Sequence, residues 1–162
     1  MSRHVFYSLH YEKDRARADL VRKLSGLVPN LEAKPTEWAA LQRTGDFAIK
    51  RWFEQQARGR SCTIVLIGAE TASRKWVRYE IERSWQLGLG VLGVYIHRLK
   101  DERGQQATQG EDPFLAAGLG AHAALIRSYD PPEQDSKLAY RYIADHLEKW
   151  VELAVATRVA QR

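Results

Sequence analysis

Cysteine, metal-site motifs and long apolar runs are scarce in this sequence of 162 residues. The one cysteine, Cys62, lies inside an apolar run and has no partner for an internal disulfide, which predicts a reducing, cytoplasmic compartment. The amino terminus carries no long apolar segment, so we expect neither a signal peptide nor a membrane anchor. No cluster of histidine and cysteine has metal-ligand spacing, and we expect no metal site.

The glycine-rich phosphate loops of two large nucleotide-binding classes are also missing. No Gly-x-Gly-x-x-Gly pattern follows a predicted strand, and no Walker loop is present. A phosphate-accepting receiver domain would need an aspartate at the end of its third strand, where Gly68 stands. The sequence therefore argues against all three of these protein classes.

The composition is that of a globular protein, with 44% hydrophobic and 28% charged residues. Its length predicts a single domain over residues 1–162. The formal charge of +5 is mildly basic and by itself does not identify a partner. No aromatic and basic binding motif accompanies the charge, so no nucleic acid and no membrane is expected as a partner.

Apolar runs alternate with amphipathic stretches along the chain, which predicts alternating strands and helices. The strands are expected at 5–7, 31–33, 62–67, 91–96 and 123–126, and the main helices at 14–27, 47–59, 76–87 and 136–157. The polar segment 97–120 is expected to be a long surface loop. This order predicts an α/β, flavodoxin-like fold: a five-stranded parallel sheet of order 2-1-3-4-5 with helices on both faces.

In that strand order the first and third strands are neighbours, and ligand crevices form where the order reverses. The loops after these strands, residues 8–14 and 68–75, should converge on one cleft. The second loop leads to Trp76 and Glu80, whose spacing places them one above the other on a helix face. An aromatic ring beside a carboxylate suits the glycosidic bond of a nucleotide.

Two segments resemble a known family. Residues 5–14, Val-Phe-Tyr-Ser-Leu-His-Tyr-Glu-Lys-Asp, resemble the opening strand and loop of TIR-type domains. Residues 63–71 and 75–81, the latter Lys-Trp-Val-Arg-Tyr-Glu-Ile, resemble the TIR-like branch typified by the ThsB proteins of the Thoeris antiphage system. The resemblance extends over roughly the first two-thirds of the chain.

The resemblance implies an enzyme that cleaves the nicotinamide–ribose bond of NAD and releases a cyclic ADP-ribose isomer as a signal. The essential glutamate of the Trp-x-x-x-Glu pattern falls on Glu80. The implied contacts to NAD, which is substrate rather than cofactor, are Phe6, Tyr7, Ser8, Asp14, Trp38 and Trp76. The implied partners are a product-sensing effector protein, a phage trigger and further copies of the chain bound through TIR–TIR contacts.

The chemistry of NAD cleavage agrees with the roles that the resemblance implies for these residues. Cleaving a bond to a cationic pyridinium develops oxocarbenium character on the ribose, and nicotinamide leaves as a neutral molecule without a general acid. One carboxylate near the ribose stabilises the developing charge. Cyclisation in place of hydrolysis requires that water is excluded while a second nucleophile of the same molecule is held close.

Each candidate also has a purely structural explanation. Glu80 would be a solvated helix residue without the family pattern, and Asp14 is a candidate N-cap of the first long helix. Packing alone would account for Phe6, Trp38 and Trp76. Ser8 could close a turn, and a lone loop histidine such as His10 is usually exposed.

A second hypothesis is a non-catalytic module for protein–protein interaction. The proline–glycine loop of receptor-type TIR domains is absent, and residues 39–45, Ala-Ala-Leu-Gln-Arg-Thr-Gly, stand in its place. This departure argues against adaptor-like assembly through that loop. A third hypothesis, a domain that processes nucleic acid, depends on the basic charge alone.

Overall fold

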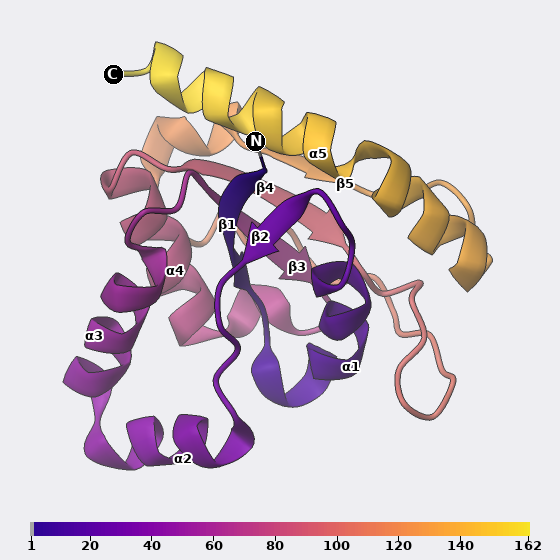
Figure 1. The fold of residues 1–162 in the computed structure, drawn as a ribbon, viewed down its shortest axis with the longest axis horizontal. Coiled ribbons are helices and arrows are strands. Elements are labelled where there is room, and N and C mark those ends of the chain that lie inside the picture. The colour runs from indigo at the N-terminus through magenta and orange to yellow at the C-terminus, as the bar shows by residue number, and fades with distance from the viewer. Residues whose placement is uncertain (1) are drawn as a thin grey trace.

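A central parallel sheet organises the molecule, and the computed structural model describes it over residues 2–162 (Figure 1). The strands are β1 (Arg3–Ser8), β2 (Leu27–Pro29), β3 (Cys62–Ile67), β4 (Gly90–Tyr95) and β5 (Arg127–Tyr129). They pair in the order β2-β1-β3-β4-β5, and every pairing is parallel. This confirms the predicted flavodoxin-like fold and strand order.

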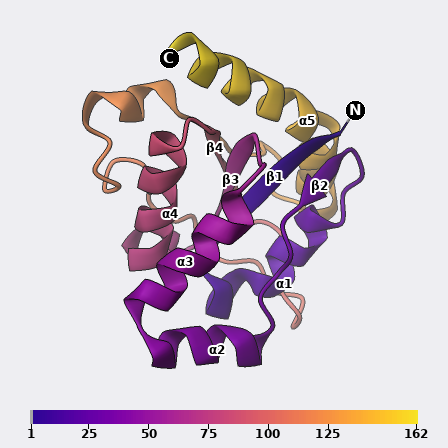
Figure 2. The same ribbon diagram turned by 60° about the vertical axis from the view of Figure 1, so that its left-hand side comes forward.

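Helices cover both faces of the sheet. They are α1 (Tyr11–Arg22), α2 (Pro35–Thr44), α3 (Asp46–Ala57), α4 (Lys75–Gln86) and α5 (Ser136–Ala160), with short 3₁₀ turns at Thr71–Ser73 and Gly120–Leu125. Figures 1 and 2 show α1 and α5 on one side of the sheet, α3 and α4 on the other, and α2 at the periphery. None of these helices is both long and apolar enough to cross a bilayer.

Alternate strand residues divide the core between the two faces, as the period of two in a strand requires. Ile64 and Leu66 of β3 pack with Ile143 of α5 on one face. Val65 and Ile67 pack toward α4 on the opposite face. All six residues of β3 are buried, as expected for the middle of a sheet covered on both sides.

Two predicted strands are wrong in position. The second strand was expected at 31–33, but β2 occupies Leu27–Pro29 because α1 ends at Arg22 and the chain turns at Gly26, whose φ is 98°. The last strand was expected at 123–126, but this segment lies in the 3₁₀ turn and β5 follows it at Arg127–Tyr129.

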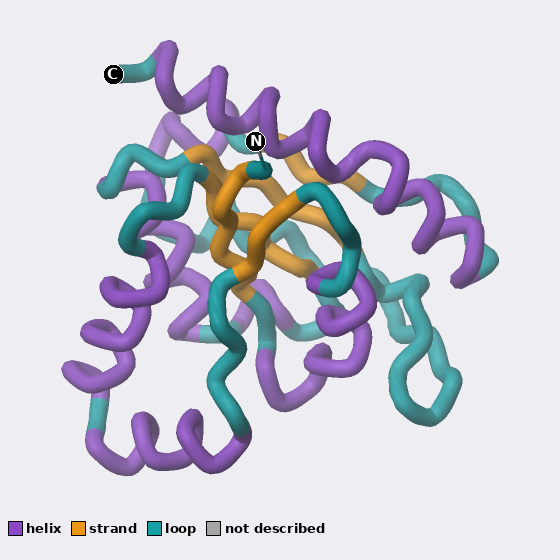
Figure 3. The backbone as a smooth tube through the Cα atoms, viewed as in Figure 1, coloured by secondary structure: helices purple, strands orange, loops and turns teal. Residues whose placement is uncertain are grey.

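The segment between β4 and the 3₁₀ turn at Gly120 contains no regular helix or strand, and Figure 3 shows it as loop. It is nevertheless packed on the sheet edge. A Cβ atom at Gly110 would clash with the carbonyl oxygen of Gly68, so the two backbones touch. Phe114 is buried in the same core cluster as Val65 and Ile81.

Candidate active site

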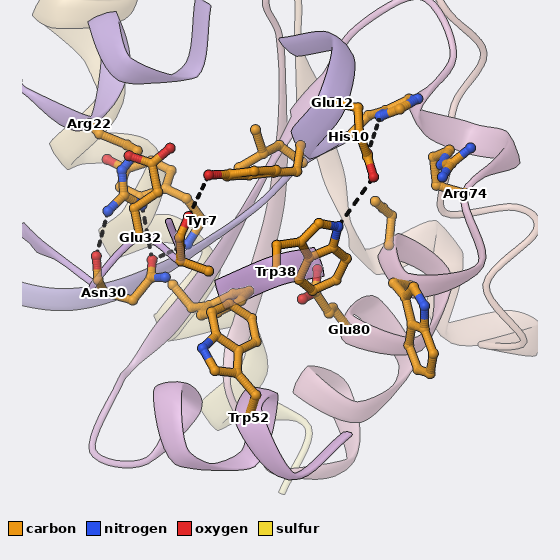
Figure 4. Close-up of a pocket in the computed structure, with 16 residues that line it drawn as sticks. Tyr7, His10, Glu12, Arg22, Asn30, Glu32, Trp38, Trp52, Arg74 and Glu80 are labelled. Carbon is orange, nitrogen blue, oxygen red and sulfur yellow. Dashed lines mark hydrogen bonds and ion pairs between the residues drawn. The ribbon is translucent and has the colours of Figure 1, made fainter. Parts of the chain in front are cut away.

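A pocket opens at the point where the strand order reverses, between the carboxyl ends of β1 and β3 (Figure 4). It has about 620 Å³ of space, part of it open to solvent. Of the predicted site residues, the pocket is lined by Phe6, Tyr7, Trp38, Trp76 and Glu80. Segments that are far apart in sequence therefore meet here, as the topology predicts.

Glu80 is the carboxylate of this pocket. It lies one helical turn after Trp76 on α4, whose inner face packs on β3, and only 7% of Glu80 is exposed. The hydroxyl of Ser8, at the end of β1, donates a hydrogen bond of 2.6 Å to Oε1 of Glu80. The structure thus excludes the alternative in which Glu80 is a solvated surface residue.

Burial dominates the electrostatics of Glu80. It raises the pKa of the carboxyl group to about 8, although the hydrogen bond from Ser8 acts in the opposite direction. No ion pair within residues 2–162 involves Glu80. A carboxyl group with this pKa is mostly neutral at pH 7 and gains its charge when a cation comes close.

Aromatic rings form much of the remaining wall. Phe6 packs edge-on against Phe53, with ring centroids 4.9 Å apart, and against Trp52 at 6.1 Å. Trp52 in turn contacts Trp38 at 6.1 Å. Phe6 is 1% exposed and belongs to the core as well as to the pocket, so both of its sequence interpretations agree with its position.

Trp38 comes from the peripheral helix α2. Its indole Nε1 donates a hydrogen bond of 3.2 Å to Glu12 Oε1, and its ring also contacts Tyr11 at a centroid distance of 6.2 Å. None of the residues of α2 is buried, so this helix contributes no side chain to the core. Trp38 therefore connects α2 to the pocket.

Tyr7 lies at the end of the pocket formed by β1 and the segment after β2. Its backbone N–H donates to Asn30 Oδ1 at 3.0 Å, and the guanidinium group of Arg22 lies 5.6 Å from its ring centroid. Arg22 and Asn30 also line the pocket. Neither was identified from the sequence. The second strand was expected at 31–33, four residues beyond β2, and Arg22 lies at the end of α1 with no motif to mark it.

Asp14 and Ser8 are the predicted contacts that do not line the pocket, and of these Ser8 bonds through its side chain to a lining residue, Glu80. Asp14 belongs to a separate buried cluster. It is 2% exposed and lies beside Arg17, with 3.4 Å between Oδ1 and the Arg17 Nη1 atom, while Thr71 donates to its Oδ2. The N-cap interpretation is also wrong, because α1 begins at Tyr11 and its N-cap is His10. Burial raises the pKa of Asp14 despite the nearby Arg17.

His10 is the clearest residue that sequence reasoning missed. It was expected to be exposed, yet it is 6% exposed and lines the pocket. Its Nδ1 atom lies 3.3 Å from Glu12 Oε2, but it makes no hydrogen bond with any described residue. The sequence did offer one indication that His10 lies at the pocket: it stands in the loop after the first strand, directly before a helix.

These features define a class before any comparison is made: a flavodoxin-like α/β domain with a buried carboxyl group in an aromatic pocket at the switch point. Among residues 2–162, no group of three or more His, Cys, Asp or Glu side chains is placed to hold a metal ion. The pocket offers the buried carboxyl group of Glu80, two further glutamates (Glu12 and Glu32), cationic side chains and several aromatic faces for chemistry.

Comparison with known proteins makes the class specific. Residues 6–101 match the family described as "Thoeris protein ThsB, TIR-like domain". Over 120 residues the chain is 33% identical to a Bacillus cereus (strain MSX-D12) protein named "Putative cyclic ADP-D-ribose synthase ThsB1". That alignment covers 70% of this chain and 62% of the relative. The family match spans more than half of the chain, and the chain belongs to the ThsB TIR-like family.

Proposed function

We propose that this protein cleaves the nicotinamide–ribose bond of NAD and forms a cyclic ADP-ribose-type signal in antiphage defence. The observation that carries the proposal is Glu80, a buried carboxyl group bonded to Ser8 in an aromatic pocket. The printed name of the Bacillus cereus relative points to the same product class. Phe6, Tyr7, Trp38 and Trp76 are the proposed pocket contacts, and Ser8 is the proposed partner that orients Glu80.

The raised pKa of Glu80 fits a cationic substrate. The pyridinium ring of NAD brings a positive charge into a dry site, which favours the ionised carboxylate. The carboxylate then stabilises the oxocarbenium character that develops on the ribose as neutral nicotinamide leaves. NADH carries no such charge in its ring, so the same pocket should bind it more weakly and should not cleave it.

Aromatic walls favour cyclisation over hydrolysis. The rings of Phe6, Trp38 and Trp52 give the pocket apolar surfaces that exclude water, although polar side chains such as Glu12 and Asn30 also line it. A nucleophile of the adenine end of the same molecule can then reach the ribose first. The cyclic product would be read by an effector protein, and a phage component would start the reaction.

The decisive experiment follows NAD in extracts of cells that express the wild-type protein or Glu80→Gln, before and during phage infection. We expect nicotinamide release and a product one water lighter than ADP-ribose from the wild type only. Glu82→Gln, a change on the exposed face of the same helix, is the matched control and should behave as the wild type. Equal NAD consumption by wild type and Glu80→Gln in both conditions would refute the proposal.

The same variants separate catalysis from a purely adaptor role. If the chain acts only by binding other proteins, Glu80→Gln should protect cells as well as the wild type does. If catalysis is required, Glu80→Gln should fold normally and give no protection. Phage plaque counts, with the circular dichroism of each purified variant as a folding control, distinguish these two results.

A further inference from the structure

One hydrogen bond fixes the orientation of the Trp38 ring in the pocket. The indole N–H is the single polar group of this side chain, and it donates to Glu12 Oε1 at 3.2 Å. The ring also packs against Tyr11 at a centroid distance of 6.2 Å and against Trp52 at 6.1 Å. A hydrogen bond weakens steeply as its angle changes, so Glu12 determines the direction in which the indole points.

The carboxylate of Glu12 is itself held by a second residue. Its Oε2 atom lies 3.3 Å from Nδ1 of His10, whose side chain is only 6% exposed. Both residues belong to the start of α1, which is anchored in the core through Ala18 and Val21. Figure 4 shows the resulting chain of contacts from His10 through Glu12 to Trp38. Glu12 therefore connects the peripheral helix α2 to a fixed wall of the pocket.

The charge of Glu12 strengthens this connection. Burial acts to raise the pKa of Glu12, but its own backbone N–H and the indole N–H of Trp38 prevail, and the pKa is lowered. Glu12 is therefore ionised at neutral pH. A hydrogen bond to an ionised acceptor is stronger than one between neutral groups.

Trp38 has no other firm attachment, because no residue of α2 is buried. Trp38, Glu12 and Glu80 all line the same pocket, which is partly open to solvent. Without Glu12 the indole N–H would take water as its acceptor, since an unpaired donor is costly. That water would enter the pocket that holds Glu80.

We propose that Glu12 is a positioning residue that holds the Trp38 ring in the pocket and thereby determines how much NAD is cyclised rather than hydrolysed, an inference that rests on the proposed function. In this reaction the bond from C1′ of the ribose to nicotinamide breaks, and its electron pair leaves with nicotinamide. C1′ then bonds either to a nucleophile of the adenosine half or to water, and an oxygen nucleophile releases its proton to the solvent. A fixed Trp38 ring excludes water and favours the first outcome.

The ratio of cyclic product to ADP-ribose tests the proposal. Mass spectrometry measures it in extracts of infected cells supplied with isotopically labelled NAD. Glu12→Ala removes the acceptor, so the ratio should fall about fivefold, the change that the loss of one ordinary hydrogen bond produces. Total nicotinamide release should change less, whereas general damage to the fold would lower both products together. Glu12→Gln keeps an acceptor oxygen and should retain most of the wild-type ratio.

A double-mutant cycle assigns the effect to the contact itself. Trp38→Phe keeps a ring but lacks the N–H, so it should lower the ratio as Glu12→Ala does. The double variant should be no lower than either single one, because both remove the same bond. Glu70→Ala is the matched control: it removes an exposed carboxylate that pairs with Lys13 and does not line the pocket.

A second measurement needs no turnover. The protein has five tryptophans, and after labelling with 5-fluorotryptophan the Trp38 signal in the fluorine NMR spectrum is the one missing from Trp38→Phe. Glu12→Ala should shift this signal, and Glu70→Ala should leave it in place. An unshifted Trp38 signal in Glu12→Ala would overturn the proposal whether or not NAD is cleaved.

The proposal would also be overturned by an unchanged product ratio in Glu12→Ala, by an equal fall in Glu70→Ala, or by additive effects in the cycle. Each of these results, with cleavage that still depends on Glu80, refutes the role of Glu12 and leaves the proposed function standing. Absence of NAD cleavage with a shifted Trp38 signal would refute the enzyme and the product control, and would leave the contact between Glu12 and Trp38 as a purely structural one.

Discussion

A single buried carboxyl group makes the stability of this protein depend on pH. The pKa of Glu80 is about 8 in the folded protein, against 4.5 for an ordinary glutamate. Between these values the folded protein holds a proton that the unfolded chain has released. The free energy of unfolding therefore falls as the pH rises through this window, by at most about 1.4 kcal/mol per pH unit from this group.

Glu80→Gln removes that titration, so the variant should gain stability relative to the wild type as the pH rises from 5 to 8. Urea denaturation at each pH measures the difference. Glu82→Gln, on the exposed side of α4, should follow the wild type throughout. Parallel stability curves for wild type and Glu80→Gln would show that Glu80 does not titrate in this window.

The same group predicts the pH dependence of NAD cleavage. The free enzyme must lose the Glu80 proton, so kcat/KM should rise up to about pH 8. The hydrogen bond from Ser8 lowers the pKa of Glu80, and Ser8→Ala should therefore move this rise to higher pH. Initial rates of nicotinamide release from pH 6 to 9 provide the measurement. A flat profile, or one that Ser8→Ala leaves in place, would contradict the role of Glu80.

Residue spacing explains which site residues could be predicted. Trp76 and Glu80 are four apart on a helix, and this fixes their common face without knowledge of the fold. Asp14 and His10 differ, because their burial depends on tertiary packing. Asp14 is enclosed by Arg17 and Thr71, and local spacing does not reveal a neighbour that is 57 residues away.

At the scale of elements, α2 is the least secured part of the pocket. None of its residues is buried, and Trp38 connects it to Tyr11 and Glu12 of α1 and to Trp52 of α3. Few buried contacts predict low local stability. The amides of α2 should therefore exchange hydrogen faster than those of α4.

Trp38→Ala should increase exchange in α2 further and leave exchange in α4 and the global stability nearly unchanged. Trp38→Phe keeps a ring but loses the indole N–H, so its exchange rate in α2 should lie between those of the wild type and Trp38→Ala. Gln42→Ala, an exposed position of α2, serves as control. Hydrogen exchange followed by mass spectrometry resolves these segments. If Trp38→Ala destabilised the whole protein, the view of α2 as a separately held element would be wrong.

The elements that could be predicted are those with strong local patterns. Continuous apolar residues identified β3 and β4, and helical spacing identified α4 and α5. The edge strands β2 and β5 have three residues each, and their sequence patterns are weak. Their positions depend on the turns that precede them, at Gly26 and at Gly120–Leu125, which the apolar pattern does not reveal. Pro29 has no N–H to donate and is tolerated because β2 is an edge strand.

At the scale of the whole molecule, one buried arginine joins three distant segments. Arg17 of α1 donates to the carbonyl oxygens of Leu99 and Gln105, each at 2.8 Å, and lies beside Asp14. Asp14 accepts a hydrogen bond from Thr71 in the loop after β3. The long segment after β4 is thereby attached to the same edge of the sheet at which the pocket opens.

Arg17→Met should destabilise the protein by about 3–5 kcal/mol, because it leaves Asp14 buried without its compensating charge and releases the segment around Gln105. Asp14→Asn added to Arg17→Met should recover part of the loss, since the two groups are coupled. Arg15→Met breaks an exposed pair with Glu32 and a cation–π contact with Tyr11, and should cost less than about 1 kcal/mol. Urea denaturation of the wild type, Arg17→Met, Asp14→Asn and the double variant completes the cycle. Strictly additive costs at Arg17 and Asp14 would mean that the two groups are not coupled, and a cost of Arg17→Met below about 1 kcal/mol would mean that other contacts hold the segment, such as the close approach of Gly110 to Gly68.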